Sequence, residues 1–298
     1  MNSNSGPGPR PEFVDWDMLP QLIAWFERKG ELFTEQLPPA RCRRRLRYAD
    51  GVATTLDLLL PQVAAEPLVP PPLLLYFHGG YWQAGSAREA LYLGEPLLAA
   101  GLAVAFVDYD LAPAITLDMM VGQAAAALAW CFRNAEELGV DRRRIVVAGH
   151  SCGGHLAAEL LATNFAVIGP DLPPCPAAAI VSFSGVFDLE QHMLHPTTAE
   201  LKAQGLNAAT RLDADAARRL SPYRKMPTCS IPVVLFVGER EEEEFHRDHV
   251  ALSAAWSPLL ALEGTVVARA DHFSCLETLA DPESVAFTRV VSLCMTGQ

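Results

Sequence analysis

The stretch that decides the fold is Val146-Val147-Ala148-Gly149-His150-Ser151-Cys152-Gly153-Gly154-His155-Leu156. An apolar, β-branched run leads into Gly-x-Ser-x-Gly, and a run of small residues typical of a helix follows to about residue 163. In this order of strand, sharp turn and helix, the turn lifts a serine hydroxyl out of a sheet in a strained backbone conformation. The flanking glycines are needed because a Cβ there would collide with a neighbouring strand or helix. Ser151 is therefore predicted to be a nucleophile rather than an ordinary helix cap.

The composition of the chain narrows the classes of protein to which it can belong. The chain has 298 residues, half of them hydrophobic, which is enough for one large core. Its net charge of -12 argues against nucleic acid as a partner, because phosphate binding needs a basic face. The seven cysteines form no Cys-x-x-Cys pair, which suits a reducing cytoplasm. The first residues lack the apolar core of a signal peptide, and no apolar run is long enough for a membrane span. We expect a cytoplasmic protein that acts on a small molecule, without nucleic acid or membrane as partners.

Strand signals alternate with helix signals along the chain. The helical signals are 117–137, 243–256 and 283–294, besides the run after Ser151. Such alternation predicts a mostly parallel, twisted sheet with helices on both faces. The residues before this region differ, because the turn Ala49-Asp50-Gly51 joins its two strands as an antiparallel hairpin. The sheet has about eight strands, predicted at 43–48, 54–60, 73–77, 104–107, 145–148, 177–183, 232–237 and 265–268.

The sequence predicts a single domain over residues 12–298. Residues 1–11 are polar and rich in Pro and Gly, so we expect them to be disordered. Residues 12–36 carry apolar residues at helical spacing and should pack on the body of the domain. The interval 186–230 has almost no strand signal and is too long for a plain loop. We expect short helices there, which form a partial lid together with segment 12–36.

The catalytic base is predicted to be His272. Acyl transfer by a serine needs a base beside the nucleophile, an acid that orients the base, and donors for the oxyanion. In a sheet of this type they follow in the order serine, acid, histidine, each after a strand. His272 follows the last predicted strand near the C-terminus, as that order requires. Its imidazole can accept the serine proton near neutral pH and return it to the leaving group.

The acid should lie in the loop after strand 232–237. That loop reads Gly238-Glu239-Arg240-Glu241-Glu242-Glu243-Glu244-Phe245, so a carboxylate is available there. Glu241 is our prediction, and Glu239 and Glu242 are the alternatives. A solvated charge run at the start of a helix would have the same composition.

The oxyanion donors are predicted to be the backbone amides of Gly79, Gly80 and Cys152. Two adjacent glycines after a buried strand let the backbone approach a substrate closely. The Cys152 amide lies at the start of the helix after the nucleophile, where it points toward the reacting group. His78 is expected to hold this turn by side-chain hydrogen bonds. The Cys152 thiol should pack behind the turn rather than act as a rival nucleophile.

No cofactor and no metal is expected. The eight histidines show no spacing typical of a zinc site. The oligomeric state is not readable from the sequence, and a homodimer through an edge strand or the last helix is compatible with it.

These residues together resemble the α/β-hydrolase superfamily, which implies an α/β-hydrolase fold. More narrowly, the chain is similar to the arylformamidase (kynurenine formamidase) branch, which is related to the hormone-sensitive-lipase-like esterases. Those esterases usually carry His-Gly-Gly-Gly, whereas this chain has the formamidase-like His78-Gly79-Gly80-Tyr81-Trp82. The other motifs that carry the resemblance are Gly149-His150-Ser151-x-Gly153-Gly154-His155-Leu156, Asp108-Tyr109-x-Leu111-Ala112-Pro113, Ser184-Gly185-Val186-Phe187-Asp188-Leu189, Ser221-Pro222, Gly238-Glu239 with Glu244-Phe245, and His272-Phe273.

Two departures from the family pattern matter. The family's acid is usually Asp, and its register falls on Glu241, whose side chain is one methylene longer. The loop must therefore sit differently, or a neighbouring carboxylate serves. The residue after the nucleophile is usually Ala, and Cys152 stands there in this chain.

The resemblance implies hydrolysis of N-formyl anilines such as N-formylkynurenine, or of small-acyl esters. Tyr81, Trp82 and His150 are the expected substrate contacts, and Tyr81 or Trp82 could narrow the acyl pocket. Packing in the core or the lid is the alternative for these two aromatic residues. The competing activity is a broad small-acyl carboxylesterase on the same fold. A catalytically silent binding protein is disfavoured, because the nucleophile and the base are both present in the required order.

Overall fold

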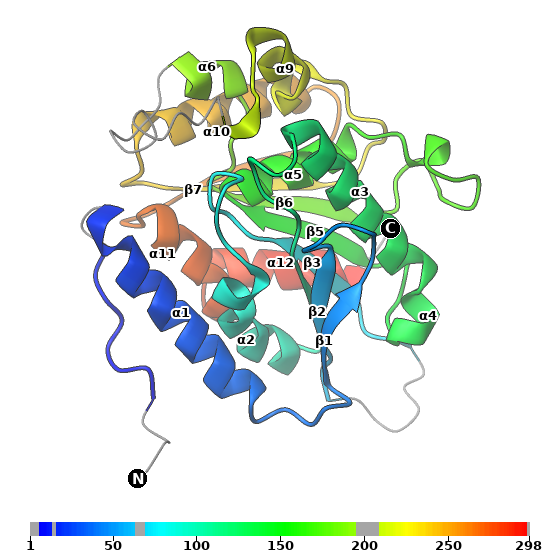
Figure 1. Ribbon diagram of the computed structural model, residues 1–298, viewed down its shortest axis with the longest axis vertical. Coiled ribbons are helices and arrows are strands. Elements are labelled where there is room, and N and C mark those ends of the chain that lie inside the picture. The colour runs from blue at the N-terminus through cyan, green and yellow to red at the C-terminus, as the bar shows by residue number, and fades with distance from the viewer. Residues whose placement is uncertain (1–5, 14–15, 63–68, 195–208, 297–298) are drawn as a thin grey trace.

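The computed structural model describes residues 6–13, 16–62, 69–194 and 209–296. An eight-stranded sheet runs through these residues, in the order β1-β2-β4-β3-β5-β6-β7-β8 (Figure 1). The pairs β1–β2 and β2–β4 are antiparallel, and all other pairs are parallel. This confirms the predicted mostly parallel sheet. The strands are β1 (Cys42–Arg47), β2 (Thr55–Leu59), β3 (Leu73–Phe77), β4 (Ala103–Val107), β5 (Ile145–His150), β6 (Ala179–Phe183), β7 (Val233–Gly238) and β8 (Leu262–Val267).

The predicted strand bounds are most accurate for the central strand β3 and least accurate for the edge strand β8. The five residues of β3 are all buried and were predicted at the observed bounds. The edge strand β8 begins three residues before the predicted start at Thr265. Its residues are only partly buried, and Glu263 and Gly264 within it are exposed. Apolar patterning therefore marks β8 weakly, because one of its edges faces no neighbouring strand.

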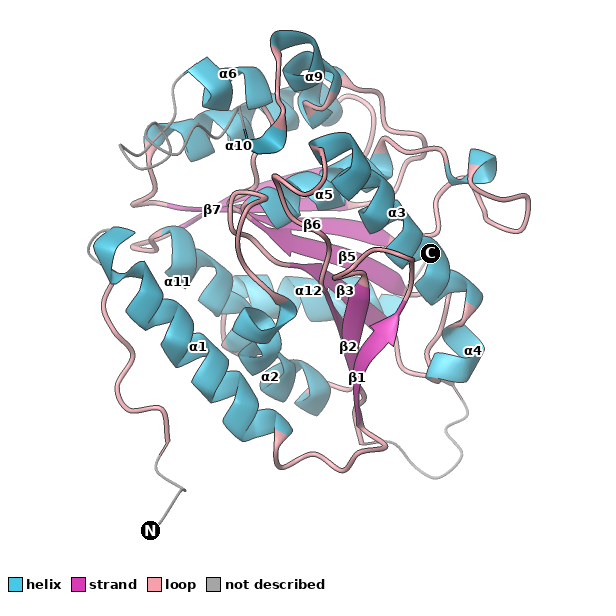
Figure 2. Cartoon of the chain, viewed as in Figure 1, coloured by secondary structure: helices cyan, strands magenta, loops and turns pink. Residues whose placement is uncertain are grey.

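Helices cover both faces of the sheet (Figure 2). One apolar core contains side chains of α3, α5 and α10, and the other contains side chains of α1, α2, α11 and α12. The principal helices are α1 (Leu19–Thr34), α2 (Gly94–Ala99), α3 (Leu117–Arg133), α4 (Ala135–Leu138), α5 (Cys152–Leu161), α10 (Glu243–Trp256), α11 (His272–Glu277) and α12 (Val285–Thr296). None of the helices in the described ranges combines the length and apolarity that a bilayer crossing demands.

The long helix predicted at 117–137 is interrupted. It ends at Arg133, and α4 begins at Ala135 after a break at Asn134. The Asn134 side chain donates to the Trp130 carbonyl at 2.8 Å. An asparagine can hydrogen-bond the backbone in this way and so compete with the helical pattern. The left-handed Gly139, with φ of 77°, ends α4.

Short helices occupy the described parts of the interval 186–230. They are α6 (Leu189–Leu194), α9 (Ala214–Arg219) and the 3₁₀ helix η4 (Pro222–Arg224). In Figure 1 α6 and α9 lie near α10, at the top of the view. Residues 195–208 of the predicted lid lie outside the described residues.

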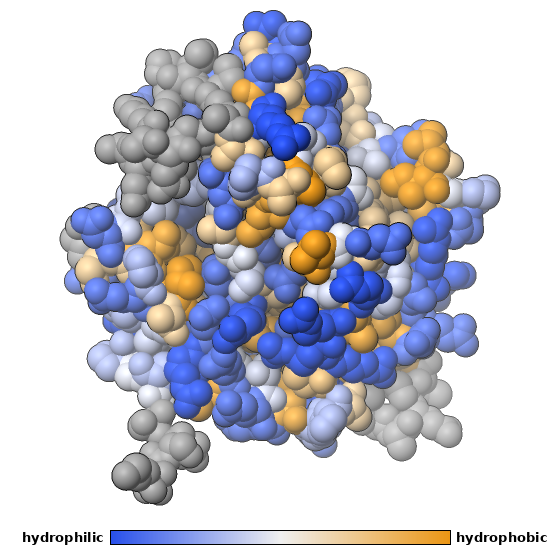
Figure 3. Space-filling view, viewed as in Figure 1, coloured by the Kyte–Doolittle hydropathy of each residue, from blue (hydrophilic) through white to orange (hydrophobic). Residues whose placement is uncertain are grey.

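The N-terminal stretch predicted to be disordered is described from residue 6 onward. Arg10 forms an ion pair with Glu277 of α11 at 2.6 Å, so this part of the stretch lies against the domain. The face shown in Figure 3 is largely hydrophilic, in keeping with the acidic composition. One apolar area on it lies at the 3₁₀ helix η3 (Phe165–Val167), where Val167 is 81% exposed.

Candidate active site

Ser151 lies in the sharp turn between β5 and α5. Its φ of 55° and ψ of -123° are unusual for a residue with a side chain. A Cβ on Gly149 would lie 2.1 Å from the Gly153 carbonyl oxygen, and one on Gly153 would lie 2.1 Å from the Phe77 carbonyl oxygen. Both glycines are thus required by contacts of the turn with itself and with the neighbouring strand β3. The strained conformation and these contacts agree with the geometry that the motif predicts.

His272 is the first residue of α11, a short helix after β8. Asp271 caps this helix by accepting the amides of Phe273 and Ser274 at 2.9 and 2.8 Å. The Ser274 hydroxyl accepts the Asp271 amide at 2.8 Å, which completes a capping box. The cap fixes the backbone at His272, and the imidazole lines the same cavity as Ser151.

Glu241 holds the His272 ring. His272 Nδ1 lies 2.7 Å from Glu241 Oε2. Glu241 Oε1 accepts the Ser184 hydroxyl at 2.6 Å and the Gly238 amide at 2.5 Å. Burial by itself would raise the pKa of Glu241, but the hydrogen bonds from His272, Ser184 and Gly238 outweigh it, so this pKa is lowered. Glu241 is therefore a carboxylate near neutral pH, and it fixes the proton of His272 on Nδ1.

Neither alternative acid forms a hydrogen bond with His272 among the described residues. Glu239 is exposed and accepts the backbone amide of Arg269 at 2.6 Å. Glu242 is the residue that precedes α10. Of the three candidates, Glu241 alone hydrogen-bonds His272 among the described residues. The longer glutamate fits because its loop turns back on itself, with the Glu241 amide bonded to the Gly238 carbonyl at 3.2 Å.

Ser184 is a residue of the site for which the sequence predicted no role. It follows β6 at the same sheet edge as Ser151 and has a positive φ of 52°. Its hydroxyl reaches Glu241 across 57 residues of sequence. The sequence did contain one indication of this role: Ser184 is a polar residue directly after a buried strand. The carboxyl ends of parallel strands meet at one edge of the sheet, so such a residue lies near the nucleophile.

The glycine turn after β3 lies against the nucleophile. A Cβ on Gly79 would lie 3.2 Å from the Ser151 Cβ, which shows how closely the backbone approaches there. Gly80 has a φ of 115°, and a Cβ on it would lie 2.2 Å from the Ala84 carbonyl oxygen. Cys152 begins α5, and the first amides of a helix have no acceptor within the helix. The predicted donors Gly79, Gly80 and Cys152 thus come from two turns that adjoin Ser151.

His78 holds this turn as a neutral side chain. Its Nδ1 lies 2.7 Å from the Gly79 carbonyl oxygen, so this nitrogen carries the proton. The ring stacks on Tyr109, with centroids 4.3 Å apart. Burial lowers the pKa of His78 to about 4. The His78 side chain is also one of the residues that line the cavity.

The Cys152 thiol is packed away from the cavity. Cys152 is fully buried and is not among the residues that line the cavity. Its sulfur accepts the Trp82 amide at 3.3 Å and lies 3.8 Å from the Tyr109 hydroxyl. Burial raises the pKa of the Cys152 thiol to about 11, so the thiolate that a nucleophile requires is scarce at neutral pH.

His150 is the last residue of β5, directly before Ser151, and it holds the backbone of His272 by a hydrogen bond. Its Nε2 donates to the His272 carbonyl oxygen at 2.9 Å, and the two rings are 4.5 Å apart. Burial, and then the charge of His272, lowers the pKa of His150 to about 3, so the ring is neutral. His150 lines the cavity and can meet a substrate there.

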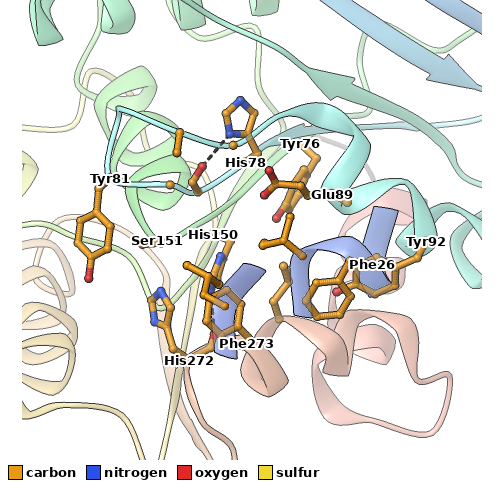
Figure 4. A pocket seen from close by; sticks show the side chains of 18 of the residues that line it. Phe26, Tyr76, His78, Tyr81, Glu89, Tyr92, His150, Ser151, His272 and Phe273 are labelled. Atoms are coloured by element: carbon orange, nitrogen blue, oxygen red, sulfur yellow. Dashed lines mark hydrogen bonds between the residues drawn. The ribbon is translucent and has the colours of Figure 1, made fainter. Parts of the chain in front are cut away.

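The cavity holds about 730 Å³ of empty space, counting its open mouth (Figure 4). Its walls come from the 3₁₀ helix η1 (Trp16–Met18), α1, the glycine turn, the 3₁₀ helix η2 (Ala87–Leu93), the nucleophile turn and α11. The lining residues are mostly apolar or aromatic; those away from the nucleophile turn include Trp16, Leu19, Ile23, Phe26, Tyr76, Tyr81, Glu89, Tyr92, Phe273 and Leu276.

The cover of this cavity comes from the N-terminal segment. Trp16 lies 5.9 Å from the Tyr81 ring and 6.1 Å from the His272 ring, between centroids. No described residue of the interval 186–230 lines the cavity. The sequence predicts that segment 12–36 forms part of a lid, but it does not single out Trp16, because the partners that this ring covers are distant in the chain.

Tyr81 and Trp82, the two aromatic residues predicted to contact the substrate, lie in different surroundings. Tyr81 lines the cavity, whereas Trp82 is 2% exposed and is not among the lining residues. The Trp82 ring packs edge-on against His155 at 5.3 Å, within the core on the α5 face. Trp82 thus takes the core packing that was the alternative for it.

The arrangement contains the groups that acyl transfer requires: a hydroxyl in a strained turn, an imidazole in the same cavity, a carboxylate on that imidazole, and two turns with backbone amides nearby. Within the described residues, no three His, Cys, Asp or Glu side chains are grouped as a metal site would need.

The chain is similar to known proteins in sequence and in structure. A family model for the alpha/beta hydrolase fold matches residues 74–256. Kynurenine formamidase of Danio rerio is 29% identical over 260 residues, which are 84% of this chain and 80% of that protein. Esterase LipC of Mycobacterium tuberculosis is 33% identical over 208 residues, which are 67% of this chain and 51% of LipC. A solved structure from Silicibacter sp., provisionally assigned as a thioesterase, has a TM-score of 0.76 and 27% identity over 97% of this chain and 98% of that chain.

Proposed function

This chain belongs to the alpha/beta hydrolase fold family, and from that premise we propose that it is a serine hydrolase of small-acyl amides and esters. N-formyl aryl amines are the preferred substrates in this proposal, and the reaction proceeds through an acyl-enzyme. The observation that carries the proposal is the hydrogen bond from His272 to Glu241, which orients an imidazole in the cavity that Ser151 lines.

In this mechanism His272 accepts the proton of Ser151 while the Ser151 oxygen attacks the acyl carbon. Glu241 keeps the proton of the resting imidazole on Nδ1, which leaves Nε2 free to accept. Glu241 then stabilises the imidazolium that forms. Its lowered pKa keeps it ionised for this purpose.

The carbonyl oxygen of the substrate becomes negatively charged in the tetrahedral intermediate. The amides of Gly79, Gly80 and Cys152 are the proposed donors to this oxygen. His78 and its bond to the Gly79 carbonyl fix the peptide orientation of the glycine turn. Each such donor typically lowers the barrier by about 3 kcal/mol.

The leaving group is then protonated by His272. An aniline nitrogen leaves poorly as an anion, so proton delivery by an acid is required for amide cleavage. Water next attacks the acyl-enzyme with His272 as base, and the Ser151 hydroxyl is restored as formate or another small acid departs. Both steps use the same three side chains.

The choice of N-formyl aryl amines rests on two supports. Kynurenine formamidases from Danio rerio and Salmo salar match this chain over 84% and 78% of its length. The cavity is lined by aromatic side chains that can stack on an aryl leaving group, among them Trp16, Tyr81 and Phe273.

A broad small-acyl carboxylesterase is the second candidate. It is favoured by the similarity to esterase LipC and to carboxylesterase NlhH of Mycobacterium tuberculosis, which is 35% identical over 141 residues. Esters and formamides pass through the same tetrahedral intermediate, so one set of groups serves both. The two activities differ in how much they depend on protonation of the leaving group.

The test is steady-state kinetics on N-formylkynurenine, p-nitrophenyl acetate and p-nitrophenyl butyrate. We expect a higher kcat/KM for the formamide, and a fall in kcat of at least about 10⁴-fold for all three in Ser151→Ala. Ser253→Ala is the matched control, because the Ser253 hydroxyl is buried in α10 without a hydrogen bond among the described residues. Ester turnover with negligible formamide turnover would select the carboxylesterase. Activity that survives in Ser151→Ala would overturn the mechanism.

A further inference from the structure

The cavity carries a second group of polar side chains, on the wall away from the catalytic histidine. Glu89 and Tyr92 come from η2, and Tyr76 comes from β3. All three line the cavity, and in Figure 4 they lie on the side opposite Tyr81 and His272. The proposed mechanism uses none of them. The residues of α1 that line the cavity are apolar: Leu19, Ile23 and Phe26.

The Glu89 carboxylate lacks a neutralising partner. The backbone amide of Ser86 donates to it, and the nearby charges of Glu27 and Asp108 are of the same sign. Burial, followed by the charge of Glu27, raises the pKa of Glu89 to about 7. A partly buried carboxylate with one donor is poorly solvated and gains from a cation.

The neighbouring cations are engaged elsewhere. Arg88, next in the chain, pairs with Glu31 of α1. Lys29 of α1 lies 5.3 Å from the centroid of the Tyr92 ring. Within the described residues, Glu89 forms no ion pair with a Lys, Arg or His side chain. The fold therefore leaves a carboxylate facing the cavity without a countercharge.

Tyr92 and Tyr76 are the aromatic residues of this wall of the cavity that accompany Glu89. Tyr92 is 2% exposed, and its hydroxyl has no hydrogen-bond partner among the described residues. Its ring stacks on Phe26 with centroids 4.7 Å apart and 12° between the planes. Burial raises the pKa of Tyr76 far above its ordinary value, and the charge of Glu89 acts in the same direction, so the Tyr76 phenol lies near this carboxylate.

We propose that Glu89 anchors a protonated primary amine carried by one arm of the substrate. The ammonium donates to the Glu89 carboxylate, while the faces of neighbouring aromatic rings stabilise its charge. The inference rests on the proposed function, since it names the substrate class of the same cavity. The substrate is then an acylated compound with an apolar or aryl middle and a cationic end.

Glu89 has a second role that the test must separate. The Glu89 carboxylate accepts the backbone amide of Ser86, the residue that precedes η2, and this bond is one half of a capping box. Glutamine serves in such a cap as well as glutamate does. Glu89→Gln therefore removes the charge and keeps the cap. Glu27→Gln is the matched control, because it removes a nearby charge from α1 outside the cavity lining.

The experiment is calorimetric titration of the full chain at pH 8.5 with 2-phenylethylammonium and with 2-phenylethanol. These probes share a skeleton and differ in charge. We expect the ammonium to bind Glu89→Gln at least tenfold more weakly than the unmodified chain, and Glu27→Gln within twofold of it. The alcohol should bind all three alike.

Equal ammonium affinity in the unmodified chain and in Glu89→Gln would overturn the inference. A parallel loss for the ammonium and the alcohol would also overturn it, because it would assign Glu89 a structural role. Calorimetry needs no turnover, so the result stands even if the protein fails to hydrolyse the substrates of the proposed reaction. Where hydrolysis of p-nitrophenyl acetate is observed, the ammonium should inhibit it competitively.

Discussion

Two glutamates lie at opposite ends of this site: Glu241 is bonded to His272, and Glu89 is part of the cavity wall. Glu241 is 7% exposed and receives hydrogen bonds from His272, Ser184 and Gly238. Glu89 is also partly buried but receives only the backbone amide of Ser86, with charges of its own sign nearby. The pKa of Glu241 is lowered despite its burial, whereas burial and the charge of Glu27 raise the pKa of Glu89 to about 7.

The difference shows that burial does not decide the state of a carboxyl group by itself. Donors aimed at the ionised form can outweigh the loss of solvation, and like charges add to it. The Glu241 end of the site is complete, because every donor is supplied by the protein. The Glu89 end is incomplete, because the protein supplies no countercharge for this carboxylate. A cationic ligand can supply it.

The largest expected effect is at the complete end. In Glu241→Gln the amide cannot accept all three donors, and it favours the wrong tautomer of His272. We expect kcat for p-nitrophenyl acetate to fall by about 10³- to 10⁴-fold with little change in KM. Glu239→Gln, which changes the exposed neighbouring carboxylate, should stay within about twofold of the unmodified chain. Equal losses in both variants would mean that the acid has been assigned to the wrong residue.

A smaller effect is expected when one donor is removed from Glu241. Ser184→Ala deletes the hydroxyl that lies 2.6 Å from Oε1. A hydrogen bond to a charged group contributes about 1.5–3 kcal/mol, so kcat/KM should fall by about tenfold or more. The pKa of Glu241 should rise, because a donor to its ionised form is lost. The pH profile of kcat/KM should therefore lose activity at a higher pH on its acid side.

The matched control for that variant lies two residues earlier, on β6. Ser182 of β6 is 1% exposed, and its hydroxyl has no hydrogen-bond partner among the described residues. Ser182→Ala should leave the pH profile where it is. A profile that moves equally in both variants would point to a general effect of β6 on the site.

The smallest effect concerns stability at the incomplete end. The pKa of Glu89 is raised in the folded chain from 4.5 to about 7, so ionisation of this group opposes folding. Above about pH 7 that cost is fully present, and it disappears as the pH falls through 7 toward 4.5. Glu89→Gln should therefore be more stable than the unmodified chain at pH 8.5, by about 1 kcal/mol after allowance for solvent screening.

Thermal unfolding at pH 8.5 and at pH 4.5 measures this difference. The gain in Tm should be a few degrees at the higher pH and close to zero at the lower. Glu27→Gln should give a smaller gain at pH 8.5, because it removes one repulsive neighbour and leaves the buried carboxylate. A gain that is the same at both pH values would contradict the view that ionisation of Glu89 is unfavourable.

Much of the fold follows from local pattern. The buried runs of β3 and β7 are apolar throughout, so the residue ranges of these strands could be predicted from local sequence alone. The strand, turn and helix around Ser151 follow from glycines whose Cβ atoms would collide with the backbone. His272 could be placed because its order after the last strand is set by the topology. These are features in which the deciding contacts lie close in sequence or follow from strand order.

Tertiary structure decided the features that depend on distant contacts. The sequence left three carboxylates open as the acid, and Glu241 differs from the others through donors 31 and 57 residues away. Trp82 and Tyr81 are adjacent and similar in character, yet one lies in the core and the other in the cavity. The sequence predicted segment 12–36 as part of a lid, but it singled out neither Trp16 nor Glu89. In each case local chemistry is alike for the competing residues, and the free energy that separates them comes from the neighbours that folding brings together.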